Sequence, residues 1–121
     1  MYSGQFVTDW GATVPICIKE DEPLEIAAGG TGFMLIKREV FEKLEPLVPK
    51  YINGNVVNSA EQFASLFFDT SVDEERQILL SEDFHFCYLA KKHGFKVHIA
   101  PWVKLTHVGS YYFNGLLPTH K

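Results

Sequence analysis

The stretch SEDFHFCYLAKKHG, residues Ser81–Gly94, carries the strongest secondary-structure signals in the chain, and it predicts one helix. Ser81 is a favoured N-cap residue, and Glu82 and Asp83 follow in the first turn, where the helix dipole stabilises negative charge. Gly94 comes directly after two lysines and a histidine, and glycine is the usual residue in the left-handed position that ends a helix. We therefore expect a helix that begins and ends within this stretch.

This helix is largely apolar on two faces, so we expect it to be packed between other elements rather than to lie on the surface. One face is formed by Phe84, Cys87, Tyr88 and Lys91, and the other by Phe86, Leu89, Ala90 and His93.

Weaker signals on both sides of the helix predict further strands and one further helix. The apolar run Phe33–Ile36 is typical of a buried strand, and Arg38–Leu44 has apolar residues at helical spacing. Phe95–Ile99 and Val103–Val108 are typical of strands. Further β-rich runs are expected at Tyr2–Thr8 and Thr13–Lys19, and loops or turns at Lys19–Pro23, Tyr51–Ser59 and Thr70–Gln77, while Gln62–Asp69 fits either a strand or a helix. The pattern predicts one α/β domain over residues 1–121.

Composition narrows the class of protein. The 121 residues include 11 Lys and Arg against 15 Asp and Glu, and this formal net charge of −4 argues against a binder of nucleic acid. No apolar run has the roughly 20 residues of a membrane span, and the N-terminus has no signal-peptide pattern. The two cysteines, Cys17 and Cys87, are expected to be buried and reduced, as in a cytoplasmic protein.

Three short stretches hold polar groups that can serve chemistry. Gly29–Gly32 lets the backbone approach a ligand, or forms a tight turn. The carboxylates of Glu82 and Asp83 can accept a proton or a hydrogen bond from a hydroxyl, or only complement the helix dipole. His107, within Thr106–Gly109 at a predicted strand end, can bind a divalent cation or a phosphate, or be structural.

Four segments together resemble the C-terminal, acceptor-side half of glycosyltransferases of the GT-A type, such as glycosyltransferase family 2. They are GTGFMLIKREVFEKL (Gly30–Leu44), FFDT (Phe67–Thr70), LSEDFHFCYLAKKHGFKVHIAP (Leu80–Pro101) and VKLTHVGSYYFNG (Val103–Gly115). The resemblance implies a partial GT-A-like mixed sheet with a few helices. The residues before Gly29 are too few for the βαβ units of the nucleotide-binding N-terminal half, and no D-x-D motif occurs, so we expect that half to be missing.

The resemblance also implies roles for individual residues. Asp83, or its neighbour Glu82, matches the carboxylate that acts as base or orients the acceptor hydroxyl. His107 matches a histidine that helps to coordinate the Mn²⁺ or Mg²⁺ bound to the nucleotide diphosphate. Substrate-binding roles are implied for the loop residues Gly30, Thr31 and Gly32 and for the aromatic residues Trp102 and Tyr111, although a core role for Trp102 fits the sequence equally well.

These roles imply a hexosyltransferase-type enzyme that transfers a sugar from a nucleotide-sugar donor to a glycan or another hydroxyl acceptor. The isolated chain is then expected to associate with itself or with the missing half, because apolar surface would otherwise be exposed. The alternative is a non-catalytic dimerising or glycan-binding module on the same scaffold. A small hydrolase is a third possibility, but the sequence shows no nucleophile elbow and no Ser–His or Cys–His pairing is expected from it.

Overall fold

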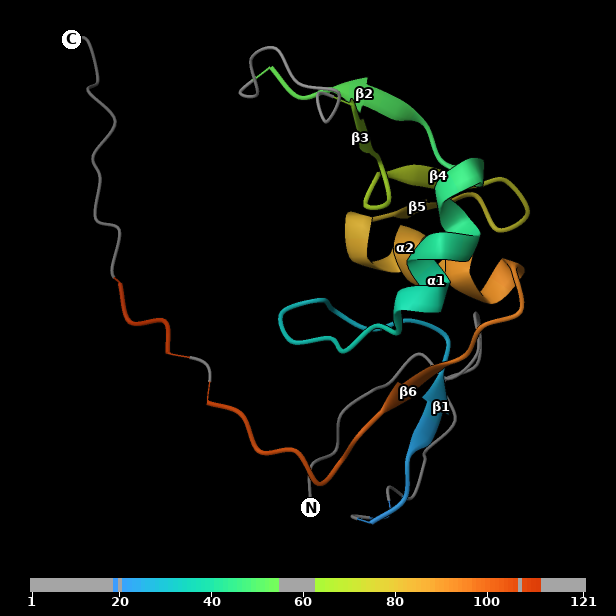
Figure 1. Ribbon diagram of the computed structural model, residues 1–121. Helices are drawn as coiled ribbons and strands as arrows, with labels where there is room; N and C mark the ends of the chain where they lie inside the picture. Colours follow the sequence, from blue (N-terminus) through green and yellow to red (C-terminus); the bar gives the residue numbers. More distant parts are fainter. Residues whose placement is uncertain (1–18, 20, 55–62, 107, 112–121) are drawn as a thin grey trace, which may run out of the picture.

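The computed structural model describes residues 19, 21–54, 63–106 and 108–111, which form two helices, a 3₁₀ turn and six short strands (Figure 1). In chain order they are β1 (Leu24–Ile26), α1 (Arg38–Leu44), η1 (Glu45–Leu47), β2 (Lys50–Ile52), β3 (Phe63–Ser65), β4 (Ser71–Asp73), β5 (Ile78–Leu80), α2 (Glu82–Lys92) and β6 (Val97–Ile99).

The strands pair as three separate antiparallel ladders. β2 pairs with β3 and β4 with β5, while β1 pairs with β6, so that Leu24 lies opposite Ile99. This third ladder joins segments from the two ends of the described chain below the helices (Figure 1). The prediction of a mixed α/β fold is confirmed. The sheets in the described part of the chain have two strands each, and a GT-A sheet is not among them.

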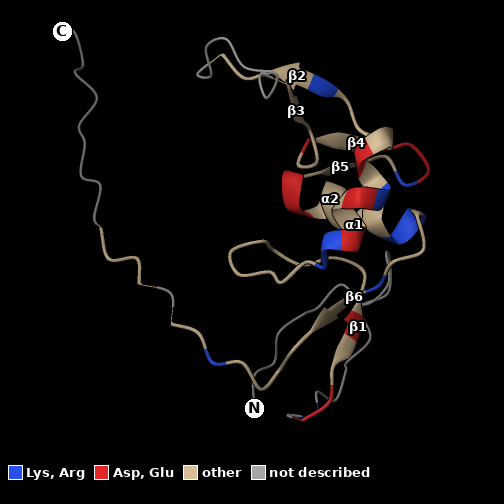
Figure 2. Ribbon diagram, in the orientation of Figure 1, with Lys and Arg blue, Asp and Glu red and all other residues tan. Residues whose placement is uncertain are grey.

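Helix α2 confirms the strongest prediction from the sequence. Its acidic first turn and its last turn with Lys91 and Lys92 place opposite charges at the two ends, as the helix dipole favours (Figure 2). Ser81 occupies the N-cap position with extended backbone, but its hydroxyl makes no capping hydrogen bond. Gly94 follows the helix with φ of +91°, the left-handed conformation expected there.

The core lies where α1 packs on α2. Val40 and Leu44 of α1 and Phe86 and Ala90 of α2 are buried together, and α1 has the bounds that its apolar spacing predicts. Aromatic rings extend this core toward β3: the rings of Phe41 and Phe67 meet edge to face at 5.0 Å, and those of Phe68 and Phe86 stack at 4.6 Å. Such pairs add to the stabilisation that burial of apolar surface provides.

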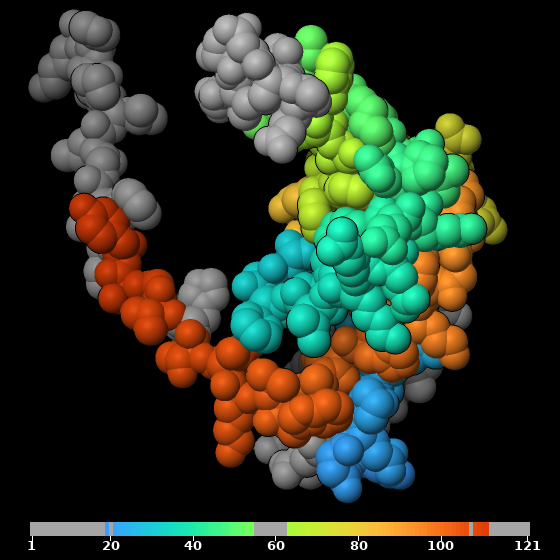
Figure 3. Space-filling view, viewed as in Figure 1, coloured from blue at the N-terminus to red at the C-terminus, as the bar shows by residue number. Residues whose placement is uncertain are grey.

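The prediction of a buried strand at Phe33–Ile36 is wrong. Met34 and Ile36 pack against the core, but Phe33 is 72% and Leu35 96% exposed, and the segment has irregular structure. It protrudes in cyan from the face shown in Figure 3. The run is apolar on both sides, as a central strand would be, but among the described residues no strand pairs with it and only one of its sides is covered.

Three other predicted elements need correction. Tyr51 and Ile52, expected in a loop, pair with β3, and the ambiguous stretch at residues 62–69 contributes that strand. Thr70–Gln77 contains β4 as well as a turn, because this polar segment forms a hairpin with the apolar β5. Residues 103–106 and 108 have no regular structure, where a last strand was predicted.

Several predictions concern residues outside the described part of the chain. The first β-rich run, Tyr2–Thr8, lies outside it, as does the second except for Lys19, which is not in a strand. Cys17 and His107 also lie outside the described residues. Among the described residues, none of the helices has the length and apolarity that crossing a bilayer requires.

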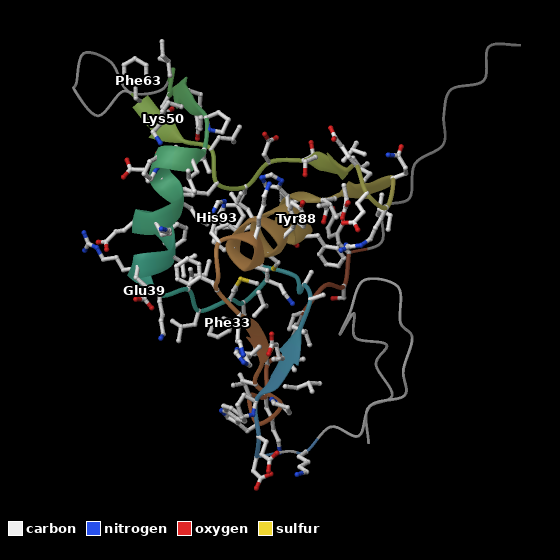
Figure 4. The ribbon with its side chains drawn as sticks, turned by 90° about the vertical axis from the view of Figure 1, so that its right-hand side faces the viewer. Phe33, Glu39, Lys50, Phe63, Tyr88 and His93 are labelled. Carbon is white, nitrogen blue, oxygen red and sulfur yellow. The ribbon has the colours of Figure 1, made fainter. Side chains whose placement is uncertain are left out.

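The hairpin β2–β3 lies away from the contact between α2 and β1. Figure 4 shows Lys50 and Phe63 at the end of α1 opposite to Glu39. The backbone carbonyl of Pro49 accepts a hydrogen bond from the amide of Leu66 at 2.9 Å, which joins the residue before β2 to the residue after β3.

The left-handed conformation of Gly94 can be tested by replacement. We expect Gly94→Ala to lower the free energy of unfolding by about 1 kcal/mol, because a Cβ disfavours positive φ. Gly32→Ala is the matched control, since a Cβ there has no neighbour within 4 Å and its backbone is outside the left-handed region. The measurement is urea unfolding followed by circular dichroism. Equal unfolding midpoints for the two variants would contradict the assignment of Gly94 as the helix stop.

Candidate functional site

The N-terminal turn of α2 lies against the glycine-rich loop. The hydroxyl of Thr31 donates a hydrogen bond to Oδ1 of Asp83, 52 residues later in the sequence, in a partly buried position. Two of the stretches singled out for chemistry are thus brought together by the fold. The contact is between residues that the sequence suggested separately, one in a loop and one in the first turn of a helix.

Two further contacts hold the same loop to the same helix. The Cys87 thiol lies 3.7 Å from the carbonyl oxygen of Gly29, and Nζ of Lys91 lies 3.3 Å from the carbonyl oxygen of Ile26. Positions 83, 87 and 91 are four residues apart and share one helix face. The chain therefore runs antiparallel to α2 from Ile26 to Thr31, and we call this stretch the anchored segment.

The loop leaves room around the carboxylate of Asp83. A Cβ added to Gly30 would lie 3.7 Å from Oδ2 of Asp83, so the backbone of this residue passes directly beside that oxygen. A Cβ on Gly32 would meet nothing within 4 Å. Both glycines are exposed, whereas Thr31 and Asp83 are half-buried. The arrangement can offer a fixed carboxylate to a small polar group that enters beside the loop.

The first turn of α2 places two acidic side chains at the positive end of the helix dipole. Asp83 and Glu82 are both in the first turn of α2, where the backbone amides give the helix end a partial positive charge. Glu82 is exposed, and its side chain makes no hydrogen bond or ion pair with another described residue. Of the two carboxylates that the sequence offered, only Asp83 is held by the loop. The geometry therefore selects Asp83 as the group that can act on a ligand.

The two aromatic candidates are not brought to this carboxylate. Trp102 is 52% and Tyr111 78% exposed, and the segment that carries them runs away from the helices after β6 (Figure 1). Since Val97 pairs with Ile26 and Ile99 with Leu24, the chain leaves β6 in the direction away from the anchored segment. The high exposure of Trp102 also excludes the core role that its sequence context allowed. His107, the candidate metal ligand, lies outside the described residues.

One side-chain pair was missed by the sequence reasoning. Oγ of Ser71 and Nδ1 of His85 are 2.7 Å apart, so the expectation that no Ser–His pairing exists is wrong. The hairpin makes this contact: Ser71 on β4 lies opposite Leu80 on β5, and β5 leads directly into α2. No spacing rule in the sequence indicates it. The pair connects β4 to α2, which is a sufficient structural role.

A second polar pair organises the turn between β4 and β5. The buried Asp73 accepts hydrogen bonds from the backbone amides of Glu75 and Arg76, and its Oδ2 lies 2.9 Å from the Arg76 guanidinium. The turn thus provides hydrogen bonds to Oδ1 of this buried carboxylate, and the opposite charge of Arg76 faces Oδ2. We assign this pair to the fold and not to a ligand site.

Neither a group of metal-binding side chains nor a similar known protein assigns a role to the described residues. In the part of the chain that the structure describes, no group of three or more His, Cys, Asp or Glu side chains is placed to hold a metal ion. Comparison of the chain with protein-family models, with curated proteins and with solved structures found no match. Roles for individual residues are therefore inferred from their contacts and positions in the fold.

The buried thiol of Cys87 makes stability depend on pH. Cys87 is a free cysteine, as expected, and desolvation by burial raises its pKa, although the hydrogen bond to Gly29 opposes this shift. The folded state therefore retains the thiol proton to higher pH than the unfolded state. As the pH rises past about 8.5, the unfolded thiol ionises first and stability falls.

We expect the difference in unfolding free energy between the wild type and Cys87→Ala to be constant below about pH 8 and to shrink above it. Urea unfolding at a series of pH values measures this difference. Cys17→Ser serves as the background in both proteins, so that Cys87 is the one thiol that changes. A difference that grows with rising pH would contradict the raised pKa.

Proposed function

We propose that this protein is a glycosyltransferase-related domain of the GT-A type that contributes the acceptor side of the site. The reaction would transfer a sugar from a nucleotide-diphosphate donor to a hydroxyl of an acceptor. The observation that carries the proposal is the hydrogen bond between Thr31 and Asp83, since it joins the two motifs on which the resemblance to these enzymes depends.

The chemistry of sugar transfer suits the geometry of Asp83. An acceptor hydroxyl that attacks an anomeric carbon must lose its proton, and a carboxylate within hydrogen-bonding reach can take it or orient the hydroxyl. The partial positive charge of the helix end attracts the carboxylate, and the hydrogen bond from Thr31 limits its rotation. In this proposal Asp83 is the base or orienting group, and the exposed Glu82 is secondary.

The cation and the aromatic residues belong to the proposal only through the resemblance. His107 would help to hold Mn²⁺ or Mg²⁺ on the donor diphosphate, where a cation offsets the charge of the leaving group. The described residues do not by themselves build a cation site, so no step above depends on the metal. In the proposal, the rings of Trp102 and Tyr111, which are both exposed, would stack on a sugar ring of the ligand.

A second function is favoured by a different observation. Large apolar side chains are exposed on the described surface, among them Phe33 and Leu35 of the protruding segment. Surfaces of this kind occur where proteins associate. A non-catalytic module that dimerises or binds a glycan would use them while Asp83 served only the helix.

Nucleotide binding provides the first test. If the site is complete in this chain, calorimetric titration with UDP or GDP will show binding that requires Mn²⁺ and that His107→Ala abolishes. The same titration of Asp83→Asn should retain binding, because the acceptor carboxylate does not touch the diphosphate in this proposal. No binding of either nucleotide at millimolar concentration would contradict enzymatic activity of this chain by itself.

Substitution of the carboxylate separates the two functions. We expect Asp83→Asn to reduce the release of UDP or GDP from UDP-glucose, UDP-galactose, UDP-N-acetylglucosamine or GDP-mannose by about 10²–10⁴-fold, the range of general-base contributions. Its stability should fall by no more than about 1 kcal/mol, because the amide still accepts the Thr31 hydrogen bond. Glu82→Gln should lose less activity. Full turnover in Asp83→Asn would contradict the role of Asp83 as base, and absence of turnover in the wild type would favour the non-catalytic module.

A further inference from the structure

We infer that Thr31 and Gly30 act on different oxygens of the Asp83 carboxylate. Thr31 positions the carboxylate through Oδ1, and Gly30, which has no side chain, leaves Oδ2 uncovered for one hydroxyl of a ligand. Its functional part rests on the proposed function, because the ligand is taken to be the acceptor. Thr31 is then a positioning residue rather than a substrate-binding one, and Gly30 controls access.

The role of Thr31 follows from what its hydroxyl contacts. The hydroxyl donates to Oδ1 of Asp83 and is half-buried with it, so this hydrogen bond lowers the rotational freedom of the carboxylate. A second donor to Oδ1 would have to share this oxygen with Thr31. Among the described residues, no hydrogen bond is made to Oδ2, which remains the oxygen for the ligand.

The role of Gly30 follows from space rather than from backbone conformation. Its φ lies outside the left-handed region, where glycine would be required, and a Cβ would be at an ordinary contact distance of 3.7 Å from Oδ2. Alanine is therefore compatible with the fold at this position. Its methyl group would nevertheless lie against Oδ2 and occupy space that an entering hydroxyl needs.

The rest of the anchored segment keeps this arrangement in register. Cys87 and Lys91 hold the carbonyl groups of Gly29 and Ile26, one and two helical turns beyond Asp83. Sliding of the loop along α2 would have to break these contacts. The ligand chemistry that fits is a single hydroxyl donor that hydrogen-bonds to Oδ2, as one hydroxyl of a sugar or another polyol would.

Carboxylate labelling tests the geometry without a substrate. The protein is treated with a water-soluble carbodiimide and glycine ethyl ester, which form an amide with an accessible carboxylate and release the corresponding urea. Fragmentation mass spectrometry then compares the label on Asp83 with that on the exposed Glu82 in the same peptide. We expect Gly30→Ala to reduce labelling of Asp83 severalfold, while Gly32→Ala, whose Cβ meets nothing within 4 Å, leaves it unchanged.

Substitution of Thr31 gives the opposite change. Thr31→Val removes the hydroxyl at similar volume and should increase labelling of Asp83, because Oδ1 is released, whereas Thr31→Ser should preserve the wild-type value. Equal labelling in Gly30→Ala and Gly32→Ala would overturn the role of Gly30. Equal labelling in Thr31→Val and Thr31→Ser would overturn the role of Thr31. Circular dichroism of each variant confirms that a change in labelling does not reflect unfolding.

Turnover of the nucleotide-sugar panel tests the functional part separately. With a donor that supports turnover, Thr31→Val should lower kcat more than it changes KM for the donor, and Thr31→Ser should restore kcat. If the wild type shows no turnover with any donor, the proposed function fails, while the labelling results still decide the geometry. If Asp83→Asn retains full turnover, the role of Asp83 as base or orienting group fails. If Asp83→Asn loses turnover but Thr31→Val does not, the positioning role fails and the proposed function stands.

Discussion

The burial of α2 on two sides is the constraint from which the other features follow. On one side Phe86 and Ala90 pack with Leu44 of α1, and on the other Cys87 is completely buried beneath the anchored segment. A helix covered in this way cannot rotate about its axis without exposing apolar surface. The direction in which Asp83 points is thus determined by packing several residues away from it.

Local sequence signals were sufficient to predict the two helices, but they were not sufficient to predict which strands pair. Arg38–Leu44 and the helix that ends at Gly94 follow from apolar spacing and from residues that begin or stop a helix. Phe33–Ile36 has the composition of a strand, but a strand also needs a partner, and the sequence contains no local sign of one. The hairpin β4–β5 was missed because its turn depends on Asp73, whose carboxylate makes bonds that composition does not reveal.

The individual residues of the candidate site could be selected from the sequence, but the contact between them could not. Thr31 and Asp83 could each be selected as polar residues in a suitable local setting, but 52 residues separate them and only the fold joins them. The same limit explains why the contact between Ser71 and His85 was not foreseen. In contrast, Trp102 and Tyr111 were chosen for residue type alone, and type does not determine where an exposed ring lies.

The uncapped first turn of α2 determines how long the site stays assembled. Ser81 leaves this turn without a side-chain cap, and helix ends that lack a cap fray more readily than the turns behind them. Fraying would carry Asp83 away from Thr31, while Cys87 and Lys91, deeper in the helix, could keep the loop in place. The fraction of molecules with an assembled carboxylate then equals the closed fraction of one helical turn. Amide hydrogen exchange at His85, whose N–H donates to the carbonyl oxygen of Ser81, would report that fraction before the rest of the fold opens.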